Sequence, residues 1–229
     1  VDNGVAGKPR VDYFTMGSEL ASGAALDLQR LPQGQTLAGV LGPALHERVQ
    51  KELAPLGINS ELLAGARPWY AALLVMQARL AQAGFRAEDG VDYQIAQRAQ
   101  RDGKPLRGLE SAVEQLSIFA AMPMEEQREF LRATLDETDM AREIAEVTAV
   151  WRRGDLVQLE SLLRSGADES PAFFKALTTD RNLKWLPRIE AMLEDPQDDY
   201  LVVTGALHMV GEQGLPELLR RKGYRIDRR

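Results

Sequence analysis

The chain has no cysteine, and only two of its 229 residues are histidines. The lack of cysteine excludes disulfide bonds, thiolate metal ligands and cysteine nucleophiles. No apolar run approaches the roughly 18 residues that a membrane-spanning helix needs, and no signal-peptide pattern is present. The sequence also lacks a P-loop, a GxGxxG fingerprint, a GxSxG elbow and an HExxH motif. These absences remove the usual signatures of kinases, simple Rossmann dehydrogenases, serine hydrolases and zincins.

Positive charge is scarcer than negative charge, with 28 lysines and arginines against 34 acidic residues and a net charge of −6. Nucleic-acid binding needs a basic footprint, so we expect no nucleic-acid partner. The apolar and charged fractions, 45% and 27%, are typical of a soluble globular protein. The length predicts a single domain over residues 1–229. Because the sequence starts at Val1 without a methionine, we expect that upstream residues are missing from it.

Helix-forming patterns dominate, but three short segments have the character of strands: residues 11–16, 106–109 and 200–205. Four apolar or β-branched residues follow one another in 200–203, which suits a strand covered on both faces. A further edge strand is expected near residues 224–226. Strands separated by helices predict a helix-rich α/β fold with a central mixed β-sheet flanked by helices. The almost wholly helical segment 124–164 is expected to be a helical insertion.

Proline and glycine predict several helix ends. Pro68 should kink a long helix or begin a new one, and Gly84 should end it. Gly154 with Asp155 should end one helix and cap the next, and Pro171 suits the first position of another. Pro187 should kink or restart the helix that contains it. The chain's tryptophans are expected in the core: Trp69, Trp151 and Trp185.

His208 is the histidine in the more site-like position, three residues after Gly205 and next to the predicted strand 200–205. Ligands in open α/β sheets bind outside the carboxyl ends of strands, and Gly205 allows a sharp turn or a close approach to a ligand. The functional interpretation is therefore a metal ligand or general base. The alternative is a histidine whose hydrogen bonds are satisfied by a neighbouring loop.

Two carboxylates are candidates for the same site. Glu110 follows the predicted strand 106–109, so it would face the same crevice as His208 if the two strands were parallel neighbours. The alternative is that it stabilises the start of the next helix. Asp92 is either an ordinary helix N-cap or a carboxylate ligand, with Gly90 permitting a tight approach. A cation held by histidine, aspartate and glutamate would activate water.

Arg181 and Asn182 fall in the first turn of a predicted helix. An arginine is unfavourable near the positive end of a helix dipole, which suggests a specific partner such as a carboxylate in the site or on a substrate. A local pair with Asp180 is the alternative. His46 lies in a polar helical stretch and is expected to face solvent.

The order of five short motifs resembles the TraB/PrgY/GumN family, which is related to the Tiki proteases. The likeness runs from Ala64 to Arg225. Its motifs in chain order are GVDYQIA, GKPLRGLESAVEQL, VWRRGDL, DRNLKW and VVTGALHMVGEQGLPELLRRKGY. The last one, Gly-x-x-His followed by Gly-x-x-Gly-Leu and Lys-Gly-Tyr, is the most specific.

The resemblance implies a mixed-sheet α/β fold and a metal-dependent hydrolase or peptidase of the bacterial envelope or periplasm. It implies a divalent metal (Mn, Co or Zn) and a peptide or small-molecule ligand. Position by position, it assigns these roles: His208, Glu110 and Asp92 as metal ligands; Glu110, His208, Arg181 and Asn182 as catalytic residues; Gly90 and Gly205 as glycines that shape the site.

The family pattern has a first Gly-x-x-His motif that this sequence lacks. The nearest match, Gly42 to His46, is one residue too long and lies in a helical context. We expect the missing motif to precede Val1. Its absence also motivates a second hypothesis, a non-catalytic envelope protein that binds a peptide or another small ligand. A third hypothesis, a haem-handling module, rests on a single histidine.

Overall fold

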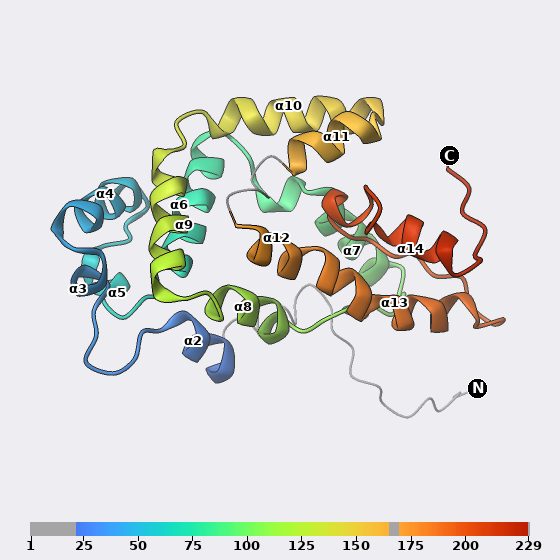
Figure 1. Ribbon diagram of the computed structural model, residues 1–229, viewed down its shortest axis with the longest axis horizontal. Helices are drawn as coiled ribbons and strands as arrows, with labels where there is room; N and C mark the ends of the chain where they lie inside the picture. The colour runs from blue at the N-terminus through green and yellow to red at the C-terminus, as the bar shows by residue number, and fades with distance from the viewer. Residues whose placement is uncertain (1–21, 165–169, 229) are drawn as a thin grey trace.

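The computed structural model describes residues 22–164 and 170–228 as a set of packed helices (Figure 1). The α-helices in chain order are α2 (Gly23–Gln29), α3 (Leu37–Leu41), α4 (Pro43–Leu53), α5 (Ser60–Leu63), α6 (Pro68–Gln82), α7 (Val91–Arg101), α8 (Ala112–Ala120), α9 (Met124–Asp136), α10 (Met140–Arg153), α11 (Leu156–Leu163), α12 (Pro171–Leu177), α13 (Thr179–Leu193) and α14 (Leu215–Arg221). Three short 3₁₀ helices join them: η1 (Ala54–Leu56), η2 (Ala87–Asp89) and η3 (Ala206–His208).

The predicted α/β fold with a central mixed β-sheet is wrong for the described part of the chain. Residues 22–164 and 170–228 contain no strand, and their only β-type pairing is an isolated bridge between Arg30 and Ala66. Residues 106–109, 200–205 and 224–226 form neither strand nor sheet, whereas the predicted strand 11–16 lies outside the described residues. The physical reason is packing: apolar side chains of all three segments cover helices α13 and α14 instead of filling a sheet. A short apolar run in a sequence does not reveal whether the segment forms a strand or covers a helix.

Helix ends follow the predicted proline and glycine signals. Pro68 is the first residue of α6, and Gly84, just after that helix, has a φ of 85°. Gly154 ends α10 in the left-handed conformation, and the Asp155 side chain accepts the backbone N–H of Gln158 at 3.0 Å at the start of α11. Pro171 begins α12. Pro187 lies inside α13 without ending it.

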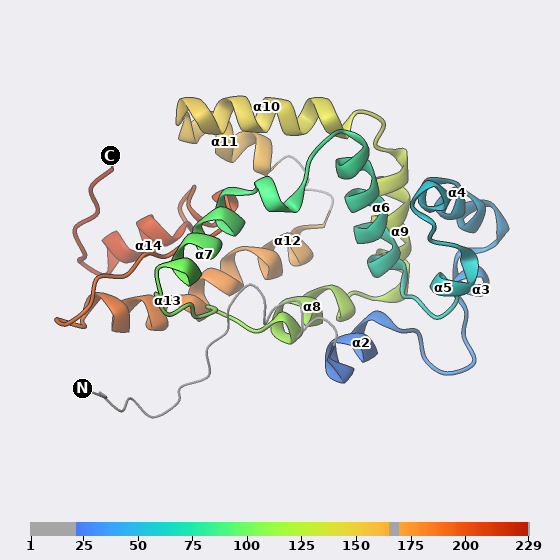
Figure 2. The ribbon, with the colours of Figure 1, turned by 180° about the vertical axis from the view of Figure 1, so that it is seen from behind.

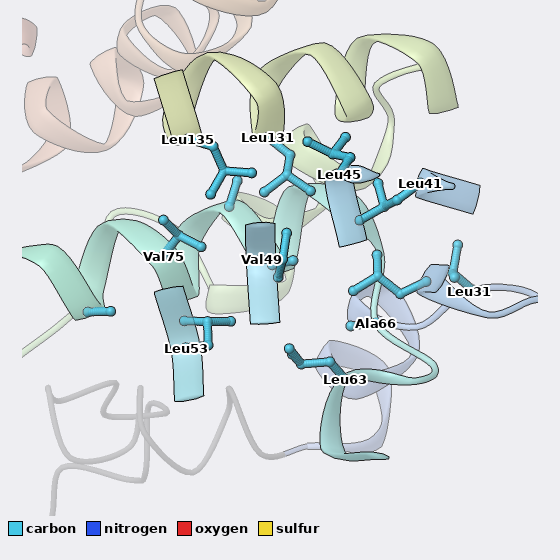
Figure 3. Close-up of a cluster of buried hydrophobic side chains, with 14 residues drawn as sticks. Leu31, Leu41, Leu45, Val49, Leu53, Leu63, Ala66, Val75, Leu131 and Leu135 are labelled. Carbon is cyan, nitrogen blue, oxygen red and sulfur yellow. The ribbon is translucent and has the colours of Figure 1, made fainter. Parts of the chain in front are cut away.

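The largest core lies where α4, α6 and α9 meet (Figure 3). We call it the main core. Leu131 and Leu135 of α9 point towards Val49 of α4 and Val75 of α6 (Figure 3). Its buried members are Leu31, Leu37, Leu41, Leu45, Val49, Leu53, Leu63, Ala66, Ala71, Ala72, Val75, Ala78, Leu131 and Leu135. The residues repeat at intervals of three and four along each helix, which places them on one face.

A second apolar cluster joins α13 to α14 at the opposite end of the molecule from α3, α4 and α5 (Figures 1 and 2). We call it the C-terminal cluster. Its buried members are Trp185, Leu186, Ile189, Leu215, Leu218 and Leu219. Leu109 and Val202 pack against it from the irregular segments. The cluster therefore holds the two segments that carry Glu110 and His208 close to α13.

The remaining helices bridge or flank these two clusters. Helices α10 and α11 pack together along one edge of the molecule (Figures 1 and 2). Helices α9 to α11 cover the segment 124–164, whose status as an insertion stays a prediction. Trp69 and Trp185 are buried as predicted, but Trp151 is 48% exposed because it lies on the outer face of α10. No helix in the described ranges is both long and apolar enough to cross a membrane.

Candidate functional site

The first turns of α13 carry three of the side chains that form the candidate site. Arg181 and Trp185 are four residues apart and therefore share one face of the helix. The Arg181 guanidinium lies over the Trp185 ring, with its Cζ 4.7 Å from the ring centroid. Asn182 points into the protein and is only 1% exposed. The helix begins after Thr178, whose hydroxyl donates to the carbonyl of Phe174 at 2.7 Å.

Glu110 reaches this face of α13 from the segment before α8. The next residue, Ser111, is the N-cap of α8 and forms a capping box with Glu114. The Ser111 N–H donates to Glu114 at 2.8 Å, and Ser111 Oγ accepts the Glu114 N–H at 3.2 Å. This pair of bonds fixes the backbone directly after Glu110. Capping of α8, the alternative role considered for Glu110, is performed by Ser111 together with Glu114.

Glu110 and Arg181 form a buried ion pair with two-point contact. Arg181 Nε donates to Oε1 and Oε2 of Glu110 at 3.0 and 3.2 Å, and Nη2 donates to Oε1 at 2.5 Å. The two side chains are only 15% and 10% exposed. The indole N–H of Trp185 donates to Oε2 at 3.2 Å. Arg181 thus has the carboxylate partner that its position predicted, and that partner is Glu110, not Asp180.

His208 is held in one tautomer by Asn182. The amide nitrogen of Asn182 donates to the carbonyls of Gln213 and His208 at 2.7 and 3.4 Å, so its oxygen must face the imidazole. This oxygen lies 2.8 Å from Nδ1 of His208, which therefore carries the proton. Nε2 lies 3.2 Å from Nη1 of Arg181 and accepts its N–H. The unprotonated nitrogen of His208 thus faces the guanidinium.

The surroundings of His208 favour the neutral ring. Burial, followed by the nearby positive charge of Arg181, lowers the pKa of His208 from 6.5 to about 4. His208 is 6% exposed, and its ring lies against Trp185 with centroids 4.6 Å apart. At neutral pH the imidazole is therefore uncharged, with its lone pair on Nε2 directed at the Arg181 guanidinium.

The contacts join five side chains, which we call the Arg181 cluster: Glu110, Arg181, Asn182, Trp185 and His208. Four of them were predicted as site residues. Trp185 was predicted only as a core residue, although it also orients Glu110 and covers His208. The signal that identifies it is the spacing of four residues from Arg181, which places an indole N–H beside whatever Arg181 binds.

Asp92 is not the N-cap of α7, which was one of its two predicted roles. The N-cap of α7 is Gly90, and Asp92 lies in the first turn. A Cβ on Gly90 would come within 2.9 Å of Oδ1 of Asp92, so this glycine does permit a close approach, that of the Asp92 carboxylate. Gly205 has an ordinary φ of −60°, and a Cβ there would meet only His208 Cδ2 at 3.7 Å. The conformation of Gly205 therefore does not demand glycine.

The Arg181 cluster contains the kinds of donor atom that bind a divalent metal, but it contains too few of them. A neutral imidazole with its second nitrogen bonded to an amide, and a buried carboxylate, are ordinary ligands and supporting contacts. Among the described residues, however, no group of three or more His, Cys, Asp or Glu could hold a metal ion. Two surface hollows of about 500 and 290 Å³ lie between α2 and the connection from α5 to α6, and at the end of α13; neither is lined by the cluster.

Comparison with known proteins gives one family and several relatives. The sequence model described as the TraB/PrgY/gumN family matches residues 12–228. The uncharacterized protein YbaP of Escherichia coli K12 is 30% identical over 190 residues, which cover 77% of this chain and 68% of YbaP. The metalloprotease TIKI1 of Danio rerio is 26% identical over 248 residues, which cover 87% of this chain and 50% of TIKI1. No solved structure shows a significant match.

Proposed function

Because the chain belongs to the TraB/PrgY/gumN family, we propose that it is a peptidase-type, metal-dependent hydrolase whose reaction centre is the Arg181 cluster. The observation that carries the proposal is the state of His208. Its ring is buried and neutral, with Nδ1 fixed by Asn182 and the unprotonated Nε2 bonded to the arginine of a buried ion pair. Perturbed titratable groups in such an arrangement are typical of reaction centres.

Metal dependence is proposed from the similarity to TIKI1, which is named a metalloprotease. His208 Nε2 and Glu110 are the donors within the Arg181 cluster that would hold the ion. The family resemblance also assigns Asp92, which does not form a group of three donors with them among the described residues. When bound, a divalent ion supplies Lewis-acid polarisation of the scissile carbonyl and a water of lowered pKa. Among the described residues, no three donors lie together. The proposal therefore includes further ligands of the ion besides His208 and Glu110.

The residues of the chain itself have distinct proposed roles. Asn182 keeps the proton of His208 on Nδ1, so Nε2, which accepts an N–H of Arg181 in this structure, is the ring nitrogen that would act as base or ligand. Trp185 fixes Oε2 of Glu110 and covers one side of the imidazole, which keeps water away from it. Arg181 is positioned to stabilise an oxyanion that develops near Nε2, because its guanidinium already lies within hydrogen-bond distance of that nitrogen.

The proposed substrate is a peptide, and the proposed location is the bacterial envelope or periplasm. Both follow from the family resemblance and not from the geometry of the cluster. The chain spans half of TIKI1, so the substrates of a full-length relative are transferred here only as a hypothesis.

A quenched-fluorescent peptide library tests the proposal, with Mn²⁺, Co²⁺ or Zn²⁺ added in turn. We expect cleavage that EDTA abolishes and that His208→Ala lowers at least about 100-fold in kcat/KM, because a positioned base contributes that much. His46→Ala, which removes the partly exposed histidine of α4, is the matched control and should cleave at the wild-type rate. The proposal fails if no added metal supports cleavage, or if His208→Ala cleaves as fast as the wild type.

A non-catalytic peptide-binding protein is the second candidate. This candidate is favoured because Arg181 already forms hydrogen bonds with both Glu110 and His208. If this candidate is correct, the immobilised chain retains peptides of the same library without cutting them. Retention combined with metal-dependent cleavage would exclude it.

A further inference from the structure

A hollow of about 500 Å³ opens between the end of α2 and the connection from α5 to α6. Its volume falls in the range of about 300–1,000 Å³ that is typical of small-ligand sites. Apolar side chains form most of its wall: Leu26, Leu62, Ala66 and Tyr70. Leu62 is 71% exposed, so a ligand that covered it would remove apolar surface from water. No residue of the Arg181 cluster lines this hollow, and its role is separate from the proposed function.

Hydrogen bonds between the two walls of the hollow fix them relative to each other. The backbone N–H of Leu31 donates to the carbonyl of Gly65 at 2.8 Å. The backbone N–H of Arg67 donates to the carbonyl of Gln29 at 2.8 Å, and its Nε donates to the carbonyl of Arg30 at 2.8 Å. These bonds pin the end of α2 to the start of α6, so the walls are in place without a ligand, as in most small-ligand sites.

Gln29 supplies a buried side-chain amide without a partner. The residue is the last of α2, is only 8% exposed and lines the hollow. Among the described residues, no group forms a hydrogen bond with this amide. Buried amides are normally paired, because an unmade hydrogen bond costs free energy. The amide has a donor and an acceptor side by side, which match the backbone N–H and C=O of a peptide.

Arg30 supplies positive charge at the edge of the hollow. It is the charged member of the described lining residues, and its side chain is exposed. Within the described part of the chain, no acidic residue forms an ion pair with its guanidinium. The guanidinium of Arg67 lies next to the same wall, where it donates to the carbonyl of Arg30. This local charge favours an anionic ligand, and a carboxylate fits a guanidinium through two parallel hydrogen bonds.

We propose that the hollow binds the C-terminal residue of a peptide when that residue has an apolar side chain. The side chain covers Leu62 and Tyr70, the backbone pairs with the amide of Gln29, and the carboxylate pairs with Arg30. A fatty acid would also cover the apolar wall and meet Arg30, but it has no N–H for the oxygen of Gln29. A peptide C-terminus satisfies the apolar wall, the amide and the charge together.

Fluorescence anisotropy of the whole chain tests this site with the labelled peptide fluorescein-Gly-Ser-Gly-Ser-Leu, prepared with a free carboxylate and with a C-terminal amide. EDTA is present throughout, so that metal-dependent cleavage does not interfere. We expect saturable binding of the acid and at least about ten-fold weaker binding of the amide, which lacks the charge-assisted bonds. Arg30→Met should bind the two peptides equally weakly.

Gly65 allows the hollow to be filled by a substitution. A Cβ on Gly65 would meet no atom of the described residues within 4 Å beyond its chain neighbours, and its φ is not positive. Gly65→Leu should therefore place a side chain in the hollow without strain and abolish saturable binding. Gly23→Leu is the matched control, because a Cβ there has equal space and Gly23 does not line the hollow. It should bind the acid peptide as the wild type does.

Three results overturn the inference: equal binding of acid and amide by the wild type, no saturable binding of the acid, or wild-type affinity in G65L. If G65L does not fold, the comparison of R30M with the wild type decides. Unlabelled N-acetyl-leucine should displace the labelled peptide at lower concentration than octanoate. Equal displacement would indicate a site for any apolar carboxylate and also overturns the peptide assignment. Each of these outcomes leaves the proposed hydrolase function intact.

Discussion

The two ends of the molecule each contain a mostly buried arginine paired with a glutamate, and the two arginines differ in their further contacts. Near the main core, Arg79 of α6 pairs with Glu52 of α4 at 2.9 Å, and their side chains are 16% and 30% exposed. At α13, Arg181 pairs with Glu110 at 2.5 Å, with 15% and 10% exposed. Charge and burial are thus similar, so the remaining contacts of each arginine decide what it does.

Arg79 directs its other N–H groups to backbone carbonyls. Nη1 donates to Thr134 and Glu137 at 2.6 and 2.5 Å, and Nη2 donates to Leu135 at 3.2 Å. These carbonyls end α9, where helices leave acceptors unsatisfied and favour positive charge. Arg79 therefore fastens α9 to α6 and α4, and its partners have no proton to exchange near neutral pH.

Arg181 directs its remaining N–H groups to the carbonyl of Leu177 and to a titratable ring, that of His208. Its charge lowers the pKa of His208, in addition to the effect of burial. An arginine whose other N–H groups donate to backbone carbonyls stabilises the packing of helices. An arginine that also donates to an imidazole influences the protonation state of that ring. The proposed function assigns a reaction centre only to the second.

Truncating the main core should have the largest effect on stability. Leu131→Ala removes a fully buried side chain between α9 and α6 and should lower the free energy of unfolding by about 4 kcal/mol. Leu183→Ala on α13 removes a side chain that is 49% exposed and should cost less than about 1 kcal/mol. Urea unfolding followed by circular dichroism measures both. Equal losses would mean that the main core does not dominate stability.

Removing each arginine separates the two pairs. Arg79→Met and Arg181→Met should each destabilise the chain by about 3 kcal/mol, because each leaves a mostly buried glutamate unpaired. The two variants should differ in the pKa of His208. R181M should raise its pKa from about 4 towards 6.5, since one of the two causes of the lowering is lost, while R79M should leave it unchanged. NMR titration of the imidazole distinguishes the variants, and an equal change in both would contradict the distinction between them.

The smallest effect is the pH dependence that His208 imposes on stability. Its pKa is 6.5 in the unfolded chain and about 4 in the folded one. Between these values the unfolded state binds more protons, so stability falls as pH drops through this window. The loss should be about 2 kcal/mol at about pH 5. Unfolding of His208→Gln should lack this contribution, whereas His46→Gln should retain it; the same slope in all three proteins would refute the assignment.

Local signals in the sequence located most helix ends but not the fold class. Pro68, Gly154 and Pro171 act within a few residues, so their effects survive without knowledge of the rest of the chain. The apolar residues 200–203 have no such local determinant. Whether they pair as a strand or cover α13 and α14 depends on distant residues, and Val202 packs on the C-terminal cluster.

The candidate site was predictable in part for a similar reason. The unfavourable place of Arg181 at a helix start indicated a carboxylate partner, and the order of motifs indicated Glu110 and His208. The tautomer of His208 depends on the side-chain amide of Asn182 and the carbonyl of Gln213. The insertion of the guanidinium between Glu110 and His208 depends on how three separate segments pack. Neither feature produces a residue spacing that can be recognised in the sequence.

The central claim is that burial and Arg181 keep His208 neutral while Asn182 holds its proton on Nδ1. It is tested most directly by ¹⁵N NMR of the imidazole nitrogens. The chain has only two histidines, and His46→Gln identifies the signals of His208. We predict separate protonated Nδ1 and unprotonated Nε2 signals at neutral pH, with protonation of the ring only near pH 4. Averaged signals from two exchanging tautomers, or protonation near pH 6.5, would contradict the account.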